Sequence, residues 1–338
     1  MAQYIYPPLV ALEQVAQDLT PRLIADRPIF DILPMVNKDT HLLEWEQMDN
    51  YIGVQQARGL DGEPPRVKKV GFKQYLMSPG VYGEHVDFNE TELTAVRQIG
   101  SFDSPLDLTD RVAQAQIQLK QRELDRIEQI GWLLLASGTF SVAGPNGSIL
   151  HQDTFAMQTF TAPVGYATTA TATPFADLRA IKLLHRGRSV SFGAGATLYV
   201  NQTTLNNILN NANPQDLFGR RVTGLVTINN VGDLNRLLAG DDLPQIAVYD
   251  EGYIDDNGTF QLYIPVNKAI LVGKRPAGQT IGQYVMTRNA NNPNTAPGPY
   301  VKVVDNGDRA VPRRIEVHAG HNGGPVLFYA GSIVVINC

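Results

Sequence analysis

The chain has 338 residues, of which 43% are hydrophobic and 18% charged, and its formal net charge is −5 at pH 7. This composition indicates a globular protein with a sizeable apolar core, and the negative charge argues against tight electrostatic binding of nucleic acid over the average surface. The single cysteine, Cys338, excludes a disulfide within the chain, which fits a reducing compartment. We expect no secretory signal, because the first basic side chain is Arg22 and no apolar core region precedes it. We expect no membrane span either, because residues 129–152, which carry no Asp, Glu, Lys or Arg, contain several glycines and Pro145.

Residues 1–36 read as an N-terminal arm. A short amphipathic helix opens at Pro8 and closes at Thr20-Pro21, and a second apolar cluster follows at residues 29–34. An isolated helix of about eleven residues is marginal in water and cannot bury such a surface alone. We therefore expect the arm to dock on the body of the chain or on another subunit.

Two extended segments, residues 42–51 and 67–76, flank a loop rich in turn-forming residues, Arg58–Arg66. The pattern predicts a long β-hairpin with a charged tip. Because an isolated two-stranded hairpin is at best marginally stable, either a third strand or a neighbouring molecule should cover it.

A long helix is predicted next. Ser104 is a good N-cap, Pro105 suits the first helical position, Asp107 suits a capping box, and Gly138 can close the helix. Residues 105–136 would make a rod of roughly 48 Å. Two apolar stripes flank a charged centre, and we expect part of its charged face to be uncovered in an isolated chain: Lys120, Arg122, Glu123 and Arg126.

Residues 141–174 read as loop, and an α/β lobe follows, in which helical and strand patterns alternate. The predicted helices are 175–185, 203–211 and 233–238; the predicted strands are 197–200, 225–228, 245–249 and 268–273, with a hairpin over 253–264 centred on Asn257-Gly258. Near the C-terminus, residues 314–319 alternate as a half-buried strand, and Gly323-Gly324-Pro325 predicts a turn. A fully covered strand over 326–336 should then return to the first lobe.

No catalytic, cofactor-binding or metal-binding pattern emerges. The motif around Ser189 lacks the second glycine of a nucleophile elbow, and the glycines of residues 193–198 precede a strand, not a helix. The histidines are scattered, and the Asn-Gly hairpin explains the acidic cluster at residues 250–256 without a metal. These observations favour a structural protein over an enzyme.

Three stretches, in this order along the chain, carry a resemblance to a known family: Arg58–Val67, Ser104–Leu108, and Ile246–Tyr253 followed by Tyr263-Ile264-Pro265. They look like the extended-loop tip, the start of the spine helix and the axial-domain hairpin of the major capsid proteins of tailed bacteriophages. The chain resembles the HK97-type fold of that family, especially its lambda-like branch, over nearly its whole length.

The resemblance implies an α+β fold with five parts. These are an N-terminal arm (1–37), an extended hairpin or E-loop (38–80), a peripheral P domain (81–173) with its spine helix at 105–137, an axial A domain (174–310), and C-terminal strands (311–338) returning to the P domain. Hexamers and pentamers of the chain would form an icosahedral virion shell in the host bacterial cytoplasm around double-stranded DNA, touched only non-specifically. The implied partners are a portal, a possible decoration protein and a scaffold, the scaffold being separate or already cleaved off; no cofactor and no membrane are implied.

The loop tip should contact a neighbouring subunit through its charges. We expect Arg58, Asp61, Glu63 and Arg66 to pair with charges on a neighbour's spine helix, for which the candidates are Asp107, Asp110, Glu123 and Asp125. Some family members cross-link Lys to Asn between subunits, and Lys68 and Lys69 with Asn291, Asn292 and Asn294 supply the residue types, although nothing in the sequence shows the required site. Two alternatives stay open: an encapsulin-like compartment that stores a cargo enzyme, and, less favoured, an α/β enzyme with a site in residues 174–273.

Overall fold

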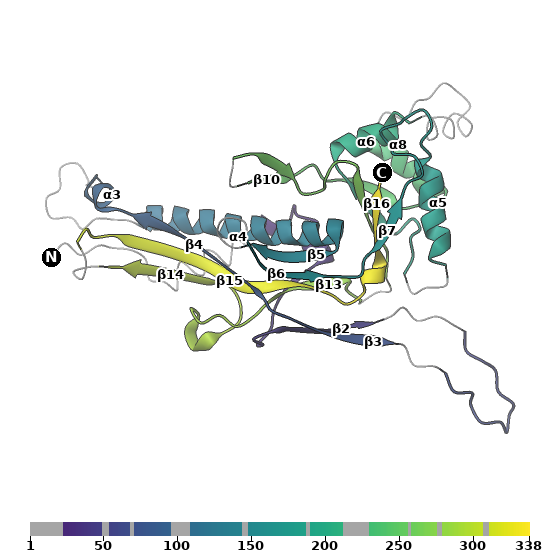
Figure 1. Cartoon of the computed structure of the whole chain (residues 1–338), viewed down its shortest axis with the longest axis horizontal. Helices are drawn as coiled ribbons and strands as arrows, with labels where there is room; N and C mark the ends of the chain where they lie inside the picture. Colours follow the sequence, from purple (N-terminus) through teal and green to yellow (C-terminus); the bar gives the residue numbers. More distant parts are fainter. Residues whose placement is uncertain are drawn as a thin grey trace. The chain divides into compact units, whose positions relative to one another are not determined.

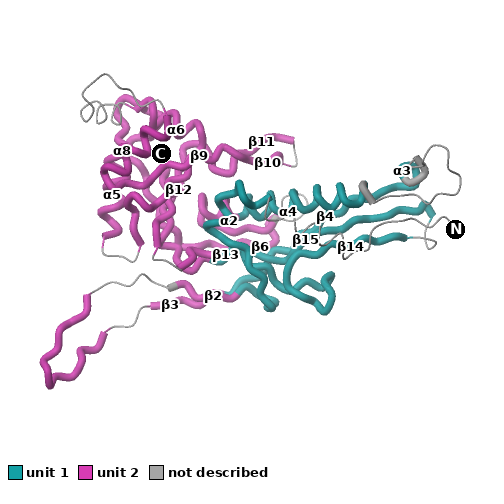
Figure 2. Tube along the Cα trace, turned by 180° about the vertical axis from the view of Figure 1, so that it is seen from behind, with its two compact units in different colours: residues 1–43, 76–130, 283–326 teal, residues 44–75, 131–282, 327–338 magenta. Residues whose placement is uncertain are grey.

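The computed structural model describes residues 23–48, 54–67, 71–95, 109–143, 148–186, 190–211, 230–255, 258–275, 279–306 and 311–338 (Figure 1). The chain divides into two compact units, each assembled from three stretches of sequence (Figure 2). Unit 1 comprises residues 1–43, 76–130 and 283–326, and unit 2 comprises residues 44–75, 131–282 and 327–338. These two units do not coincide with the five parts expected from the sequence, and the boundaries of those parts stay predictions.

Unit 1 is built on a five-stranded sheet in the order β1-β13-β15-β14, with β4 paired to β15. Its long strand β15 (Ile315–Leu327) runs antiparallel to both β4 (Gly80–Phe88) and β14 (Tyr300–Asp305). Alternate residues of β15 face the long helix α4, because a strand turns successive side chains to opposite faces. The shared core contains Val112, Ala115, Leu119, Ile315, Val317, Ala319 and Phe88.

The described part of the arm docks on unit 1, which confirms one of the two alternatives for this segment. Ile29, Phe30 and Leu33 are buried in and beside the short helix α2 (Ile29–Ile32). Strand β1 (Met35–Asn37) then pairs in parallel with β13 (Gly282–Met286). The helix predicted from Pro8 lies outside the described residues.

Helix α4 (Thr109–Ser137) is the longest helix described, with 29 residues, and it passes from unit 1 into unit 2. It ends at Gly138, as predicted: the residue has φ +70° and its N–H donates to the carbonyl oxygen of Leu134 at 2.7 Å. The predicted N-cap segment, residues 104–108, lies outside the described residues. The preceding short helix α3 (Glu90–Ala95) begins with a capping box between Asn89 and Glu92.

Unit 2 contains a second five-stranded sheet, in the order β7-β16-β12-β8-β9. Helices α5 (Pro174–Leu184), α6 (Gln202–Leu209) and α8 (Val231–Gly240) contribute leucines, isoleucines and Phe175 to the apolar core on this sheet. The α/β alternation and the strands β8 (Thr197–Val200), β9 (Gln245–Val248) and β12 (Lys268–Val272) are confirmed. The strand predicted at 225–228 lies outside the described residues.

Three two-stranded hairpins complete unit 2. The first pairs β2 (Leu43–Met48) with β3 (Phe72–Met77), as the sequence predicted, and the third pairs β10 (Gly252–Ile254) with β11 (Phe260–Leu262). The second, β5 (Thr139–Ala143) with β6 (Ile149–Thr154), and the sheet strand β7 (Gln158–Thr161) lie where a loop was expected. That expectation was wrong, because Phe140 and Val142 are buried alternately with half-exposed Thr139 and Ser141.

The C-terminal prediction needs a second correction. β15 continues through Gly323, Gly324 and Pro325 without a turn, and the chain breaks later, at a short 3-10 turn over Ala330–Ser332. The last strand, β16 (Ile333–Asn337), pairs with β12 and β7 in unit 2, whereas β15 belongs mainly to unit 1. The apolar stretch predicted as one strand is therefore two strands in two different sheets.

Candidate subunit interface

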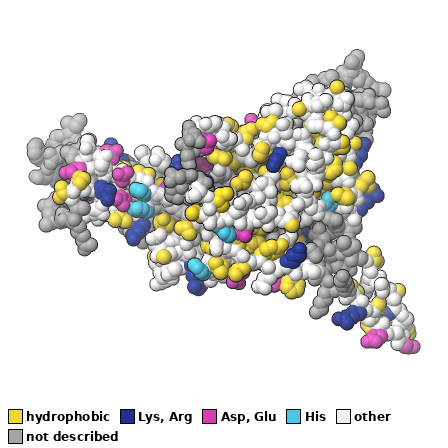
Figure 3. Space-filling model, in the orientation of Figure 1, with side chains coloured by type: hydrophobic (Ala, Val, Ile, Leu, Met, Phe, Trp, Pro, Cys, Tyr) yellow, Lys and Arg dark blue, Asp and Glu magenta, His cyan; other side chains and the backbone are white. Residues whose placement is uncertain are grey.

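The loop between β2 and β3 presents a bare surface. Every residue from Val54 to Val67 is exposed, and Leu60 at the tip is 98% exposed. The tip is closed by a turn in which the Gly62 N–H donates to the Gly59 carbonyl at 3.0 Å and the Arg58 guanidinium donates to the Gly62 carbonyl at 3.2 Å. Positive and negative side chains gather at its end (Figure 3). The loop thus offers both apolar and charged groups to a partner.

The root of this hairpin is anchored although its outer part is bare. Buried Trp45 stacks against Tyr75, with ring centroids 5.2 Å apart, and against Phe155, with centroids 5.6 Å apart. Further out, Phe72, Lys73 and Gln74 of β3 are all exposed, so both faces of the strand are uncovered there. A hairpin without a covering layer is marginal by itself, so this part of the chain is suited to be completed by another molecule.

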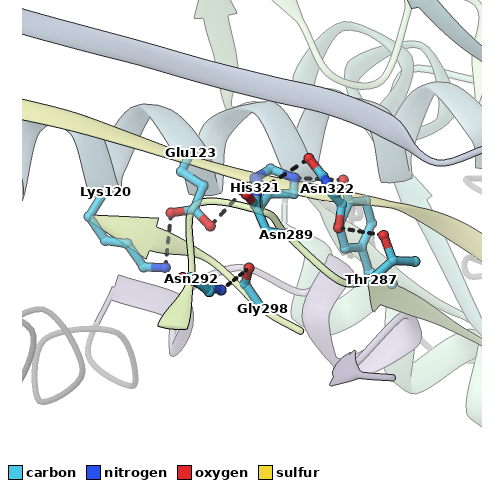
Figure 4. Close-up of polar contacts among 9 residues, drawn as sticks. Lys120, Glu123, Thr287, Asn289, Asn292, Gly298, His321 and Asn322 are labelled. Atoms are coloured by element: carbon cyan, nitrogen blue, oxygen red, sulfur yellow. Dashed lines mark hydrogen bonds and ion pairs between the residues drawn. The ribbon is translucent and has the colours of Figure 1, made fainter. Parts of the chain in front are cut away.

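One side of the charged centre of α4 is buried in unit 1 (Figure 4). Lys120 and Glu123 are each only 9% exposed, and the Lys120 Nζ lies 3.1 Å from a Glu123 carboxylate oxygen. His321 of β15 places its Nδ1 3.5 Å from the other carboxylate oxygen, and its Nε2 lies 2.9 Å from the Tyr284 hydroxyl. Burial lowers the pKa of His321 to about 4, although the nearby Glu123 carboxylate acts in the opposite direction. The imidazole is therefore neutral at neutral pH.

The other side of the same helix carries exposed charges. Arg122 forms a two-pronged ion pair with Glu84 of β4, in which its second nitrogen lies 2.8 Å from the carboxylate. Arg126 is also exposed and donates to Gln129 at 2.8 Å. The expectation that part of this face is uncovered is confirmed: Arg122 and Arg126 are exposed, whereas Lys120 and Glu123 lie on the side turned to the sheet.

The arm also occupies part of the charged centre. Arg27 lies 2.6 Å from a carboxylate oxygen of Asp125 and 3.0 Å from one of buried Glu128. Arg27 lies more than ninety positions before these carboxylates in the sequence, so the pattern of the helix alone could not predict the ion pairs. Asp125 remains half-exposed beside this pair.

The predicted contact residues fall into three groups. Arg58, Asp61, Glu63 and Arg66 lie together in the exposed loop, and Asp125 stays partly accessible on the helix. Glu123 is enclosed within unit 1, where its carboxylate faces Lys120, and its pairing with a neighbouring loop stays a prediction. Asp107 and the side chain of Asp110 lie outside the described residues. Sequence reasoning missed Arg27 and His321, and no pattern in the sequence points to either of them. The burial of Glu123 could have been inferred, because it lies four residues from both Leu119 and Ile127 and so shares their apolar side of the helix.

Within the described ranges, no group of three or more His, Cys, Asp or Glu side chains is arranged to hold a metal ion. A search of the same residues finds no helix with the length and apolar character that crossing a membrane requires.

Comparison with known proteins places this architecture. The family model described as "Phage major capsid protein E" matches residues 20–322. A crystal structure of a phage-related protein from Bordetella bronchiseptica RB50 superposes with a TM-score of 0.56 at 11% identity, covering 99% of this chain and 98% of that chain. A putative prophage capsid protein from E. coli CFT073 gives a TM-score of 0.54 at 12% identity, covering 98% and 99%. The capsid of cyanophage A-1(L) gives 0.51 at 12% identity, covering 92% of each chain. No curated protein matches.

Fold and exposed loop together define a major capsid protein of the HK97-type fold. The chain belongs to the phage major capsid protein E family, since the family model spans most of its length.

Proposed function

We propose that copies of this chain assemble as hexamers and pentamers into the icosahedral shell that encloses the double-stranded DNA genome of a tailed phage. The observation that carries the proposal is the anchored hairpin with its wholly exposed loop, residues 54–67, in a chain of a major capsid family. A long bare loop on a marginal hairpin gains stability when a second subunit covers it.

The charge of the chain suits a container for DNA. With a formal net charge of −5, the average surface cannot release many counterions from DNA, so packaged DNA would be confined without strong adhesion. The role is structural rather than catalytic. Portal, scaffold and decoration proteins are the further partners we propose, with assembly in the host cytoplasm and a final location in the virion.

Negative-stain microscopy of the purified protein, combined with nuclease protection of particles from infected cells, tests the proposal. We expect faceted shells from the protein alone or with its scaffold, and nuclease-resistant double-stranded DNA inside mature particles. A protein that stays monomeric at assembly concentrations with its scaffold would contradict shell formation. Shells filled with a cargo enzyme and free of DNA would instead favour a storage compartment.

A variant in which residues 54–67 are replaced by a short Gly-Ser linker provides the structural control. Trp45 and the rest of the root remain, so the variant should fold with an unchanged circular dichroism spectrum. We expect it to form no shells.

A further inference from the structure

A second hairpin of unit 2, β10–β11, is firmly held at its base. Tyr253 lies against Tyr263, with ring centroids 5.7 Å apart, and Tyr263 stacks on Tyr249 at 6.3 Å. Tyr249 in turn stacks on fully buried Trp132 at 5.3 Å. This column of aromatic rings fixes the direction in which the hairpin leaves the lobe.

The two strands of the same hairpin are held together beside its tip. The backbone N–H of Asp255 donates to the Thr259 carbonyl at 2.9 Å, and the Thr259 N–H donates to the Asp255 carboxylate at 2.8 Å. Ile254 and Phe260 lie directly opposite each other, on one face of the hairpin, and are 71% and 59% exposed. This two-stranded element therefore presents a largely exposed apolar pair on one face.

A hollow that could receive such a pair lies elsewhere in unit 2, between α5 and β7. Its volume is about 270 Å³, and Ile181, Leu184, Phe160 and Thr159 are among its lining residues. Leu184 is 68% exposed at its mouth, and β7 is an edge strand of the sheet. Within unit 2, the hairpin and α5 lie on opposite sides of the sheet in both views (Figures 1 and 2), so one chain cannot bring them together.

The charges beside the two surfaces are opposite. Glu251 is exposed immediately before β10, Asp250 precedes it in sequence, and Asp255 follows directly after β10. Arg186 is exposed two positions after Leu184, and among the described residues no ion pair of its guanidinium is found. Complementary charges at the rim of an apolar contact favour the correct partner and orientation.

We propose that the β10–β11 hairpin of one copy docks in the α5–β7 hollow of the next copy, with Ile254 and Phe260 over Leu184 and Glu251 facing Arg186. The two surfaces differ, so the contact is head-to-tail, and repeated by rotation it closes a ring. This inference rests on the proposed shell function and names the surfaces through which neighbouring lobes recognise each other.

The test combines an exchange of the two charges with the replacement of two apolar side chains by Asp. Sedimentation velocity and negative-stain microscopy, at one protein concentration, measure the yield of shells. We expect Glu251→Arg and Arg186→Glu each to lower the yield of shells at least fivefold, and the double variant to recover at least half of the wild-type yield. Phe260→Asp and Leu184→Asp should lower it at least tenfold. Leu150→Asp, which changes an equally exposed leucine (68%) on β6, should keep it.

All these side chains are exposed, so each variant should retain the wild-type thermal unfolding curve, which separates failed assembly from failed folding. Wild-type yields from every variant, no recovery in the double variant, or an equal loss in Leu150→Asp would overturn the head-to-tail contact while leaving the shell function intact. A wild-type protein that forms no shells would overturn both.

Discussion

At the scale of single residues, the enclosed His321 gives unit 1 a defined response to acid. The groups that face it are Tyr82, Tyr284, Glu123 and Lys120, and the charge of Arg126 acts on the two tyrosines. Burial raises the pKa of Tyr82 to about 12 and that of Tyr284 well above its usual value, so neither hydroxyl ionises in the physiological range. Among these groups, His321 is therefore the one whose protonation differs between the folded and the unfolded chain in the mildly acidic range.

The pKa of His321 falls from 6.5 to about 4 on folding, a difference equivalent to about 3 kcal/mol. The unfolded chain binds a proton below pH 6.5 that the folded chain does not bind until about pH 4, so stability is lost as the pH falls through this window. Between pH 7 and pH 5 we expect a loss of about 2 kcal/mol from this residue. Urea unfolding of the unassembled subunit measures it.

His321→Gln should lower stability at pH 7, because the packing around the imidazole changes, but it should reduce the further loss between pH 7 and pH 5 by about 2 kcal/mol. Exposed His41→Gln is the matched control and should retain the full wild-type pH dependence. An identical pH dependence in His321→Gln and wild type would refute the assignment.

The same cluster shows what sequence reasoning could reach at this scale. The exposed positions of Arg122 and Arg126 and the loop charges were predictable, because each is set by local pattern. The burial of Glu123 was not predicted, because a charged side chain on a helix is usually solvated. Lys120, which neutralises it, lies one turn earlier on the same helix, whereas its neutral neighbour His321 lies almost two hundred positions away and leaves no trace in the helix pattern.

At the scale of elements, the end of α4 depends on one glycine. Gly138 has φ +70°, and a Cβ there would lie 2.9 Å from Met157 Cγ and 3.0 Å from the Phe155 carbonyl oxygen. Gly138→Ala should therefore cost about 2 kcal/mol of unfolding free energy, through backbone strain and crowding. Chemical denaturation measures this, with Gly165→Ala as control, since a Cβ there would meet only an atom at 3.8 Å. Equal stability of the two variants would contradict the assignment.

Glycines also explain why β15 was misread. A Cβ at Gly320 would lie 2.2 Å from the Tyr82 carbonyl oxygen, and one at Gly323 would lie 2.6 Å from the Val285 carbonyl oxygen. These glycines allow neighbouring strands to approach closely, whereas a sequence pattern read alone attributes Gly-Gly-Pro to a turn. The pairing of β15 with β4 ends at Gly323, so the missing N–H of Pro325 costs no hydrogen bond on that side.

The β5–β6 hairpin was missed for a different reason. Its strands are short and mix polar with apolar residues, and they lack the long apolar periodicity that marked the helices and strands of the α/β lobe. The signal that was available, Pro145-Asn146-Gly147 between the two strands, is a hairpin-turn sequence. The helices α5, α6 and α8, with strong apolar periodicity, were predictable to within a few residues.

At the scale of the whole molecule, the charges of residues 54–67 are expected to decide whether copies associate. Arg58→Glu with Arg66→Glu places like charges opposite acidic groups such as Asp125 of a neighbouring α4, so shell yield should fall at least tenfold. The subunit itself should unfold as the wild type does, because both side chains are exposed. Light scattering during assembly measures the yield, and the charge-matched control is the double variant Arg236→Glu with Lys302→Glu, which reverses two exposed cations outside the loop.

If the arginine pair acts through charge, raising the salt concentration should lower wild-type assembly, since exposed charges are screened over about 10 Å at 0.1 M. Normal shells from the Arg58/Arg66 variant at low salt would show that the loop docks through its apolar residues alone, such as Leu60 and Val54.

The chain contains two tryptophans, and each lies at the root of one projecting hairpin: Trp45 under β2–β3 and Trp132 at the end of the aromatic column under β10–β11. Both indoles are buried among aromatic rings, so their emission depends on the geometry of those roots. The molecule thus contains two optical reporters, one for each appendage. Replacing either indole by Phe leaves the other as a single fluorophore, with which the engagement of each hairpin can be timed separately as subunits come together.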